Sequence, residues 1–281
     1  MQFELPGTLA LPDGRYLARD GEREEVLVVE TLAAPPPPRR RRRKPKDAEA
    51  GAEPTSLPLT RVTAVRAHEP FEAEAEAAGW LEGVLAAEDE IDATVDAAIG
   101  LLNRAQHAQA VAAAESHWQE LRPERAARVL VGHGSGEQVA AGRFVDAREV
   151  DLRGGASRRR RRDEELRPQE RLAAILGSRE SADTCETLLL RARADLDAGR
   201  MREAALQLRV ALEALLVELD GALTDADHEA DMAELAERRK QAGDAANAAI
   251  TDSLSIEDER RVTELTELCE RVLRRRRVLR G

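Results

Sequence analysis

The hydrophobic pattern changes its period near Phe71, and this change constrains the fold more than any other feature of the sequence. Before it, residues 14–19, 25–32 and 59–67 mix apolar, β-branched and polar side chains in the way that is typical of strands with one buried face. Asp20-Gly21, between the first two segments, tolerates the positive φ angles of a tight turn. Because a lone hairpin is marginally stable in water, the sequence predicts a small antiparallel sheet to which further strands belong.

Weaker strand patterns occur at residues 127–131 and 146–152. Between them and the first strands, apolar side chains recur at helical spacing on one face: Ile91, Val95, Ala98, Leu102 and Ala105. The surrounding segment, residues 71–103, holds nine Asp and Glu residues and no Lys or Arg. We therefore expect an acidic helical segment packed on the sheet.

The C-terminal half is predicted to be helical almost throughout. Helices are expected over residues 168–177, 181–199, 202–219 and 225–248, and from Ser255 onward. Pro168 suits a first helical turn, Ser181 can cap the second helix, and Gly199 suits the left-handed position after its end. The third helix is apolar over a wide face, which is typical of the central helix of a bundle.

These patterns predict an α+β protein that is predominantly α: a small antiparallel sheet with two helices, followed by a C-terminal helical bundle. The sheet domain is expected over residues 1–152. A disordered loop rich in proline and arginine, at 33–56, interrupts it, because four consecutive prolines favour extended backbone and the adjacent like charges repel one another. A basic linker at 153–162 leads to the bundle at 163–281.

Composition limits the class of protein. A chain with 42% hydrophobic and 35% charged residues is expected to fold, and with only 2% aromatic residues its core must be mainly aliphatic. The net charge of −11 disfavours a surface wholly adapted to nucleic acid but leaves room for local basic patches. No segment resembles a signal peptide or a membrane span, which predicts a cytoplasmic location. The strong preference for arginine over lysine indicates a bacterial, GC-rich genome.

Cysteine and histidine usage predicts neither a metal nor another cofactor. Cys185 and Cys269 are far apart and lack CxxC spacing, so they are interpreted as core thiols rather than as a disulfide or a zinc site. The five histidines, at positions 68, 107, 117, 133 and 228, show no spacing of metal-ligand pairs.

The segment Gly132–Glu137 is the one glycine-rich loop. It lacks the spacing of known phosphate-binding loops, so a strand-to-helix turn is the favoured interpretation. His133, Ser135 and Glu137 are residue types of a nucleophilic triad. Residues this close in one loop seldom converge in the required geometry, and the nucleophile-elbow motif is missing. No catalytic residue is therefore assigned.

One segment, about residues 184–218, shows a pattern of small residues at a helical turn. It contains Gly199, then Glu203-Ala204, then Ala211. In these residues the segment resembles a tetratricopeptide-type helical hairpin, and the rest of the chain does not. In that family the glycine closes a first helix, Glu-Ala opens a second, and the small residue lets the two helices approach closely. The resemblance implies a helix–turn–helix and a role in protein interaction. No second copy follows at a spacing of about 34 residues, and an independent solenoid needs about three copies. A hairpin within a plain bundle is the alternative.

Three basic runs are the candidate contacts for an anionic partner: Arg39, Arg40, Arg41, Arg42, Arg43 and Lys44; Arg158, Arg159, Arg160, Arg161 and Arg162; Arg274, Arg275, Arg276 and Arg277. Each can neutralise phosphates by releasing counterions. Against this hypothesis, no aromatic residue lies near them to stack on bases. Two alternatives are solvated linkers, and docking of the run at 39–46 on the acidic segment 71–103.

The sequence favours a non-catalytic bacterial interaction or scaffold protein that binds protein partners through helical faces, with the arginine runs as accessory anionic contacts. An RNA- or DNA-associated protein is the alternative. An enzyme that uses the Gly132–Glu137 loop is the third hypothesis. No membrane partner is expected, and the sequence indicates neither the partner's identity nor the oligomeric state.

Overall fold

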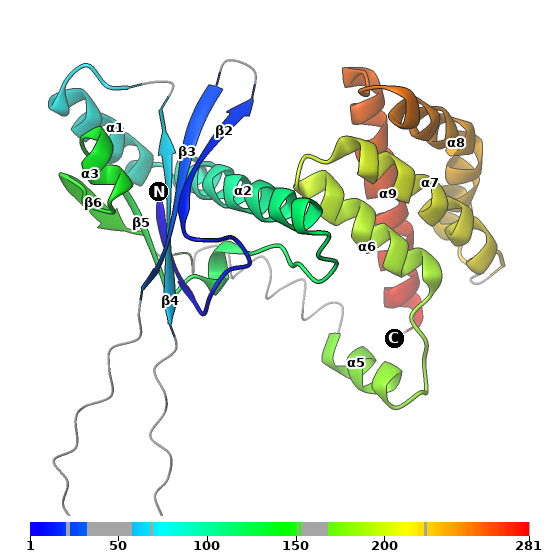
Figure 1. Ribbon diagram of the computed structural model, residues 1–281. Helices are drawn as coiled ribbons and strands as arrows, with labels where there is room; N and C mark the ends of the chain where they lie inside the picture. Colours follow the sequence, from blue (N-terminus) through cyan, green and yellow to red (C-terminus); the bar gives the residue numbers. More distant parts are fainter. Residues whose placement is uncertain are drawn as a thin grey trace, which may run out of the picture. The chain divides into compact units, whose positions relative to one another are not determined.

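The computed structural model of the 281-residue chain describes residues 1–20, 23–32, 58–67, 70–150, 152, 168–221 and 224–280. The chain divides into two compact units, Met1–Gly154 and Gly155–Gly281, each with its own hydrophobic core (Figure 1). The loop predicted at 33–56 and the linker predicted at 153–162 lie outside the described residues.

The first unit is built on a six-stranded antiparallel sheet in the order β2-β3-β4-β1-β5-β6. The strands are β1 (Gln2–Pro6), β2 (Gly14–Asp20), β3 (Arg23–Leu32), β4 (Leu59–Arg66), β5 (Arg128–His133) and β6 (Asp146–Glu149). The predicted antiparallel sheet is thus confirmed, including both of its weaker strands. Strand pairing places four apolar residues in one buried row across the sheet: Val29, Val62, Phe3 and Val129.

Two long helices and two short ones accompany this sheet: α1 (Glu74–Ala86), α2 (Glu88–Ala113), the 3-10 helix η1 (Pro123–Arg125) and α3 (Gly136–Ala140). The acidic segment therefore forms two helices, separated at Ala87, whose backbone is extended (φ −117°, ψ 109°). The predicted apolar face of α2 is confirmed, since Val95, Ala98 and Leu102 are buried in the same core as the strands.

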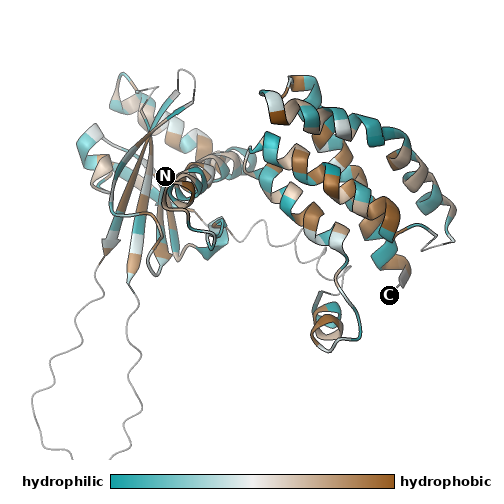
Figure 2. Ribbon diagram, turned by 45° about the vertical axis from the view of Figure 1, so that its right-hand side comes forward, coloured by the Kyte–Doolittle hydropathy of each residue, from teal (hydrophilic) through white to brown (hydrophobic). Residues whose placement is uncertain are grey.

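The second unit is a helical bundle, as predicted. Its helices are α5 (Pro168–Leu176), α6 (Thr184–Asp197), α7 (Met201–Glu218), α8 (Ala226–Thr251) and α9 (Ile256–Arg280). α7 packs between α6 and α8, and α9 packs against all three. Hydrophobic positions recur along these helices between hydrophilic ones (Figure 2), because each helix buries one stripe. Across the described part of the chain, every helix is too short or too polar to cross a lipid bilayer.

Local sequence signals set the ends of the hairpin formed by α6 and α7. The cap of α6 is Asp183 and not the predicted Ser181. Asp183 completes a capping box, in which its backbone N–H donates to Oε2 of Glu186 at 3.3 Å, and the serine two residues earlier has no such partner at the third helical position. Gly199 turns the chain between the two helices with a φ of +71°, the left-handed conformation expected of it.

Candidate functional site

The last of the three arginine runs lies on the final turns of α9, and the runs at 39–44 and 158–162 lie outside the described residues. Three members of the last run contact acidic residues near the starts of other helices. These pairs are Arg275–Asp231 (2.9 Å), Arg276–Asp183 and Arg277–Glu186 (3.2 Å). Arg274 is exposed and has no ion-pair partner within the described ranges. Most arginines of this run therefore form ion pairs within the bundle.

Glu186 lies at the centre of these contacts. Its side chain is 6% exposed, and it accepts hydrogen bonds from Arg171 of α5 at 2.6 Å and from Arg277 at 3.2 Å. Burial by itself would raise the pKa of Glu186, but the hydrogen bond and charge of Arg171, together with Arg277, lower it. Breaking one partner of a buried ion pair typically costs about 3–5 kcal/mol, because the other charge is left uncompensated. Arg277 thus stabilises the bundle. Its pairing with Glu186 competes with any contact that Arg277 could make to an outside anion.

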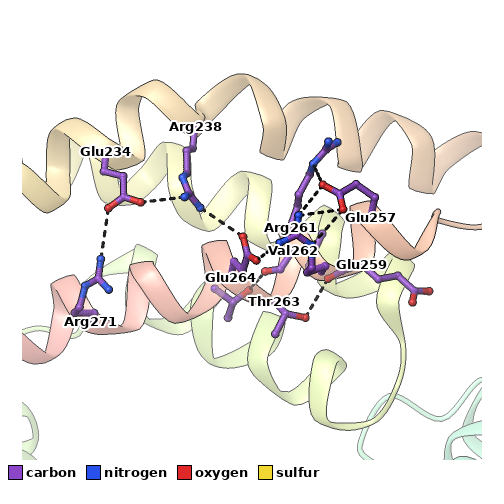
Figure 3. Close-up of polar contacts among 11 residues, drawn as sticks. Glu234, Arg238, Glu257, Glu259, Arg261, Val262, Thr263, Glu264 and Arg271 are labelled. Carbon is purple, nitrogen blue, oxygen red and sulfur yellow. Dashed lines mark hydrogen bonds and ion pairs between the residues drawn. The ribbon is translucent and has the colours of Figure 1, made fainter.

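A second series of charged residues joins α8 to α9 on the surface of the bundle (Figure 3). Arg271 contacts Glu234 at 3.5 Å, and Arg238 bridges Glu234 at 3.2 Å and Glu264 at 3.8 Å. These four side chains are between 34% and 52% exposed, so each pair contributes at most about 1 kcal/mol. The series links the two helices, and its two arginines offset the charges of its two glutamates.

The predicted core face of α7 is confirmed. The predicted positions Ala205, Leu208, Leu212 and Leu215 are fully buried, as is Leu219 directly after the helix. Leu216, also predicted to face the core, is partly buried against the same cluster.

The opposite side of α7 carries an exposed apolar stripe that the sequence analysis missed. Leu206, Val210 and Val217 are 37%, 54% and 78% exposed. Their spacing of four and then seven residues places them on one side of the helix, directly opposite the core positions. The signal was present in the sequence, but helix α7 is so apolar that its two faces could be separated only once its neighbours were known.

Polar contacts border this stripe on the side of α8. Glu213 pairs with Arg239 of α8 at 2.6 Å, and Nη1 of Arg209 donates to Oδ1 of Asn247 at 3.1 Å. An apolar centre with a polar rim is the usual anatomy of a protein–protein interface. We call Leu206, Val210 and Val217 the α7 stripe.

The glycine-rich loop is a strand-to-helix turn, as predicted, since β5 ends at His133 and α3 begins at Gly136. The three residues with triad chemistry do not come together. The carboxylate of Glu137 pairs with Arg15 of β2 at 2.7 Å, and Ser135 is exposed. His133 is buried, and its Nε2 has no hydrogen-bond partner among the residues that the structure describes.

Among the described residues, no group of three or more His, Cys, Asp or Glu side chains is arranged to hold a metal ion. Cys185 and Cys269 are free and fully buried, which confirms that they are core thiols. Burial, helped by nearby carboxylates, raises the pKa of each thiol to about 12. Both are therefore protonated at neutral pH and poorly nucleophilic.

Comparison of the chain with protein-family models, curated proteins and solved structures finds no match.

Proposed function

We propose that this protein is a non-catalytic interaction or scaffold protein that binds a protein partner through the α7 stripe. The observation that carries the proposal is the exposure of Leu206, Val210 and Val217 on the central helix of a bundle whose other face is fully buried. Exposed apolar side chains that line up on one surface mark interaction sites more often than isolated ones do. Because the stripe is straight, the partner that fits it is a helix with a matching apolar face.

Two further features support this function. The resemblance of residues 184–218 to a tetratricopeptide-type hairpin points to protein interaction, and α6 and α7 do form a helical hairpin over this range. The last arginine run is engaged by acidic residues of the bundle, which leaves the runs at 39–44 and 158–162 as the accessory anionic contacts.

The test places a photo-crosslinking amino acid at Val210 or Val217 in the full chain, produced in the cells that normally make it. The same partner is expected to crosslink from both positions. A crosslinker at Lys240, an 85% exposed side chain of α8 that pairs with its neighbour Asp244, is the control and should not capture that partner.

A test that introduces charge into the α7 stripe accompanies it. Val210→Asp/Val217→Asp should abolish recovery of the crosslinked partner by copurification without lowering the melting temperature, since both residues are exposed. The matched control, Ala233→Asp/Ala236→Asp, adds the same charge at exposed positions of α8 and should retain the partner. Equal capture from all positions, or full retention by the α7 double variant, would contradict the proposal.

A further inference from the structure

A cavity of the first unit lies at one end of its strands. β4 and β5 are both antiparallel to β1, which lies between them, so their C-terminal ends meet at this end of the sheet. There α1, α2 and α3 close over the strand ends and leave a cavity of about 840 Å³. This volume falls within the range of about 300–1,000 Å³ that is typical of sites for small organic ligands.

The walls of the cavity are mainly apolar. Trp80 and Ala77 of α1, Ala98 of α2 and Val139 of α3 line it, and the ring of Phe71 lies 5.6 Å from that of Trp80. Small side chains on the helices account for the open volume, because alanine cannot fill the space above the strand ends. An aromatic pair at an otherwise aliphatic wall favours a flat or aromatic ligand.

Among the described residues that line the cavity, one has a buried side-chain atom without a hydrogen-bond partner. His133, at the end of β5, is 7% exposed, and its Nε2 has no hydrogen-bond partner within the described residues. A buried polar atom left unpaired is destabilising, and a ligand group that hydrogen-bonds to it would relieve that cost. His133 therefore gives the cavity a point of polar recognition beside the charged side chains that line it.

The charges around the cavity select against anions. Among the described residues, three carboxylates line it, Glu25, Glu74 and Glu76, against one guanidinium, Arg66. Acids outnumber bases even when the amino group of Met1 is counted as charged. Like charges at a binding site are repelled, so an anionic ligand binds more weakly than a neutral or cationic one of the same shape.

We propose that this cavity, which we call the His133 cavity, binds a small aromatic ligand of low polarity, neutral or cationic, that forms one hydrogen bond with His133. The site is in the first unit and independent of the α7 stripe, so either proposal can fail without the other.

Two matched fluorescent probes test the chemistry. N-phenyl-1-naphthylamine is neutral, and 1-anilinonaphthalene-8-sulfonate has the same rings with an added anion. The protein is the full chain with Trp118→Phe, which leaves Trp80 as the single tryptophan of the two in the sequence. Saturable quenching of Trp80 at one probe per chain is expected, with the neutral probe about tenfold tighter than the anionic one.

Variants locate the binding. Ala97 of α2 is exposed and lines the cavity, so Ala97→Phe should fill it and weaken the neutral probe by at least about tenfold. The control Ala93→Phe adds the same ring one helical turn earlier, at an exposed position outside the cavity lining, and should leave binding unchanged. His133→Leu should weaken the probe about three- to tenfold while the melting temperature is kept or raised, because an unpaired buried group is removed.

Each of the following results would overturn one part of the proposal. Unsaturable quenching, or equal affinity in Ala97→Phe and Ala93→Phe, would overturn the site. Equal affinity for the two probes would overturn the charge preference, and unchanged affinity in His133→Leu would overturn the role of that residue.

Discussion

Nη2 of Arg277 lies 3.2 Å from Oε1 of Glu186, although 91 residues separate the two in the chain. This contact joins the end of α9 to the start of α6, next to the pair between Arg276 and Asp183. The arginines offset the negative, C-terminal end of the α9 dipole, and the acidic residues offset the positive, N-terminal end of the α6 dipole. A run of arginines that resembles a binding site in the sequence is thus largely a part of the protein's own structure.

The first prediction concerns this run. Arg276→Ala/Arg277→Ala should lower the free energy of unfolding of the bundle by about 2–4 kcal/mol, because the acidic residues at the start of α6 lose partners in a largely buried setting. Arg274→Ala, at an exposed position of the same run, should change it by less than about 0.5 kcal/mol. Urea unfolding followed by circular dichroism at 222 nm measures both. Equal effects of the two changes would contradict an internal role.

A second prediction uses the buried thiols. Cys185 and Cys269 should not react with a thiol reagent at pH 8 in the native protein, and both should react after unfolding in urea. Their pKa is raised from 9.0 to about 12 in the folded state, so unfolded chains lose these protons first. The bundle should therefore lose stability as the pH rises from about 9 towards 12. The Cys269→Ala variant should show a weaker loss over this window, and an identical loss would refute the assignment.

A third prediction concerns the cap that α7 supplies to α6. The carboxylate of Glu218 accepts hydrogen bonds from the backbone N–H of Cys185 at 2.9 Å and of Thr184 at 3.2 Å. Burial would raise the pKa of Glu218, but these hydrogen bonds outweigh it and lower the pKa below its ordinary 4.5. The stabilisation is thus complete above that pH and is lost as the pH falls below it. Glu218→Ala should cost about 0.5–1 kcal/mol at pH 7 and much less at pH 3, as measured by urea unfolding.

A fourth prediction tests the close pairing of β5 with β6 at Gly132. A Cβ at position 132 would lie 2.5 Å from the carbonyl oxygen of Asp146 and 2.7 Å from Cβ of Ala147. Gly132→Ala should therefore separate β5 from β6 and destabilise the first unit by about 1–3 kcal/mol. At Gly136 a Cβ meets nothing within 4 Å, so Gly136→Ala is the matched control and should be nearly neutral. Thermal unfolding of both variants decides the point.

A fifth prediction separates the arginine runs by function. Any affinity for RNA or DNA should reside in the runs at 39–44 and 158–162, since the run at 274–277 is mostly paired internally. Replacing the first two runs by glutamine should abolish a gel shift seen at about 50 mM salt, a condition in which phosphate contacts are strong. Glutamine at Arg274 should leave the shift unchanged. Persistence of the shift without the first two runs would contradict this assignment.

The secondary structure could be predicted from the sequence because it depends on local periodicity. Alternation of apolar and polar residues predicts the strands, and apolar residues at helical spacing predict which side of α2 and of α7 faces the core. The cap of α6 was placed two residues early, because Ser181 and Asp183 both precede an apolar run and only the Glu186 three residues after Asp183 distinguishes them. That distinction is present in the local sequence itself.

The sites depend on contacts that no local pattern encodes. The partner of Arg277 is 91 residues away, so the run could not be recognised as internal before the helices were packed. The same holds for the His133 cavity, whose walls come from strands and helices spread over most of the first unit. The exposure of Val217 likewise follows from where α6, α8 and α9 pack around α7.

The position of α9 has a consequence for how the protein is made. α6, α7 and α8 leave the ribosome first, and until α9 follows, apolar core positions that these three helices share with α9 face water. During synthesis there is therefore a stage at which three helices expose apolar core surface to water, and this stage ends when α9 has been synthesised and packs against them. During that interval the nascent chain is expected to depend on chaperones, and a ribosome that stalls before α9 would release an aggregation-prone fragment.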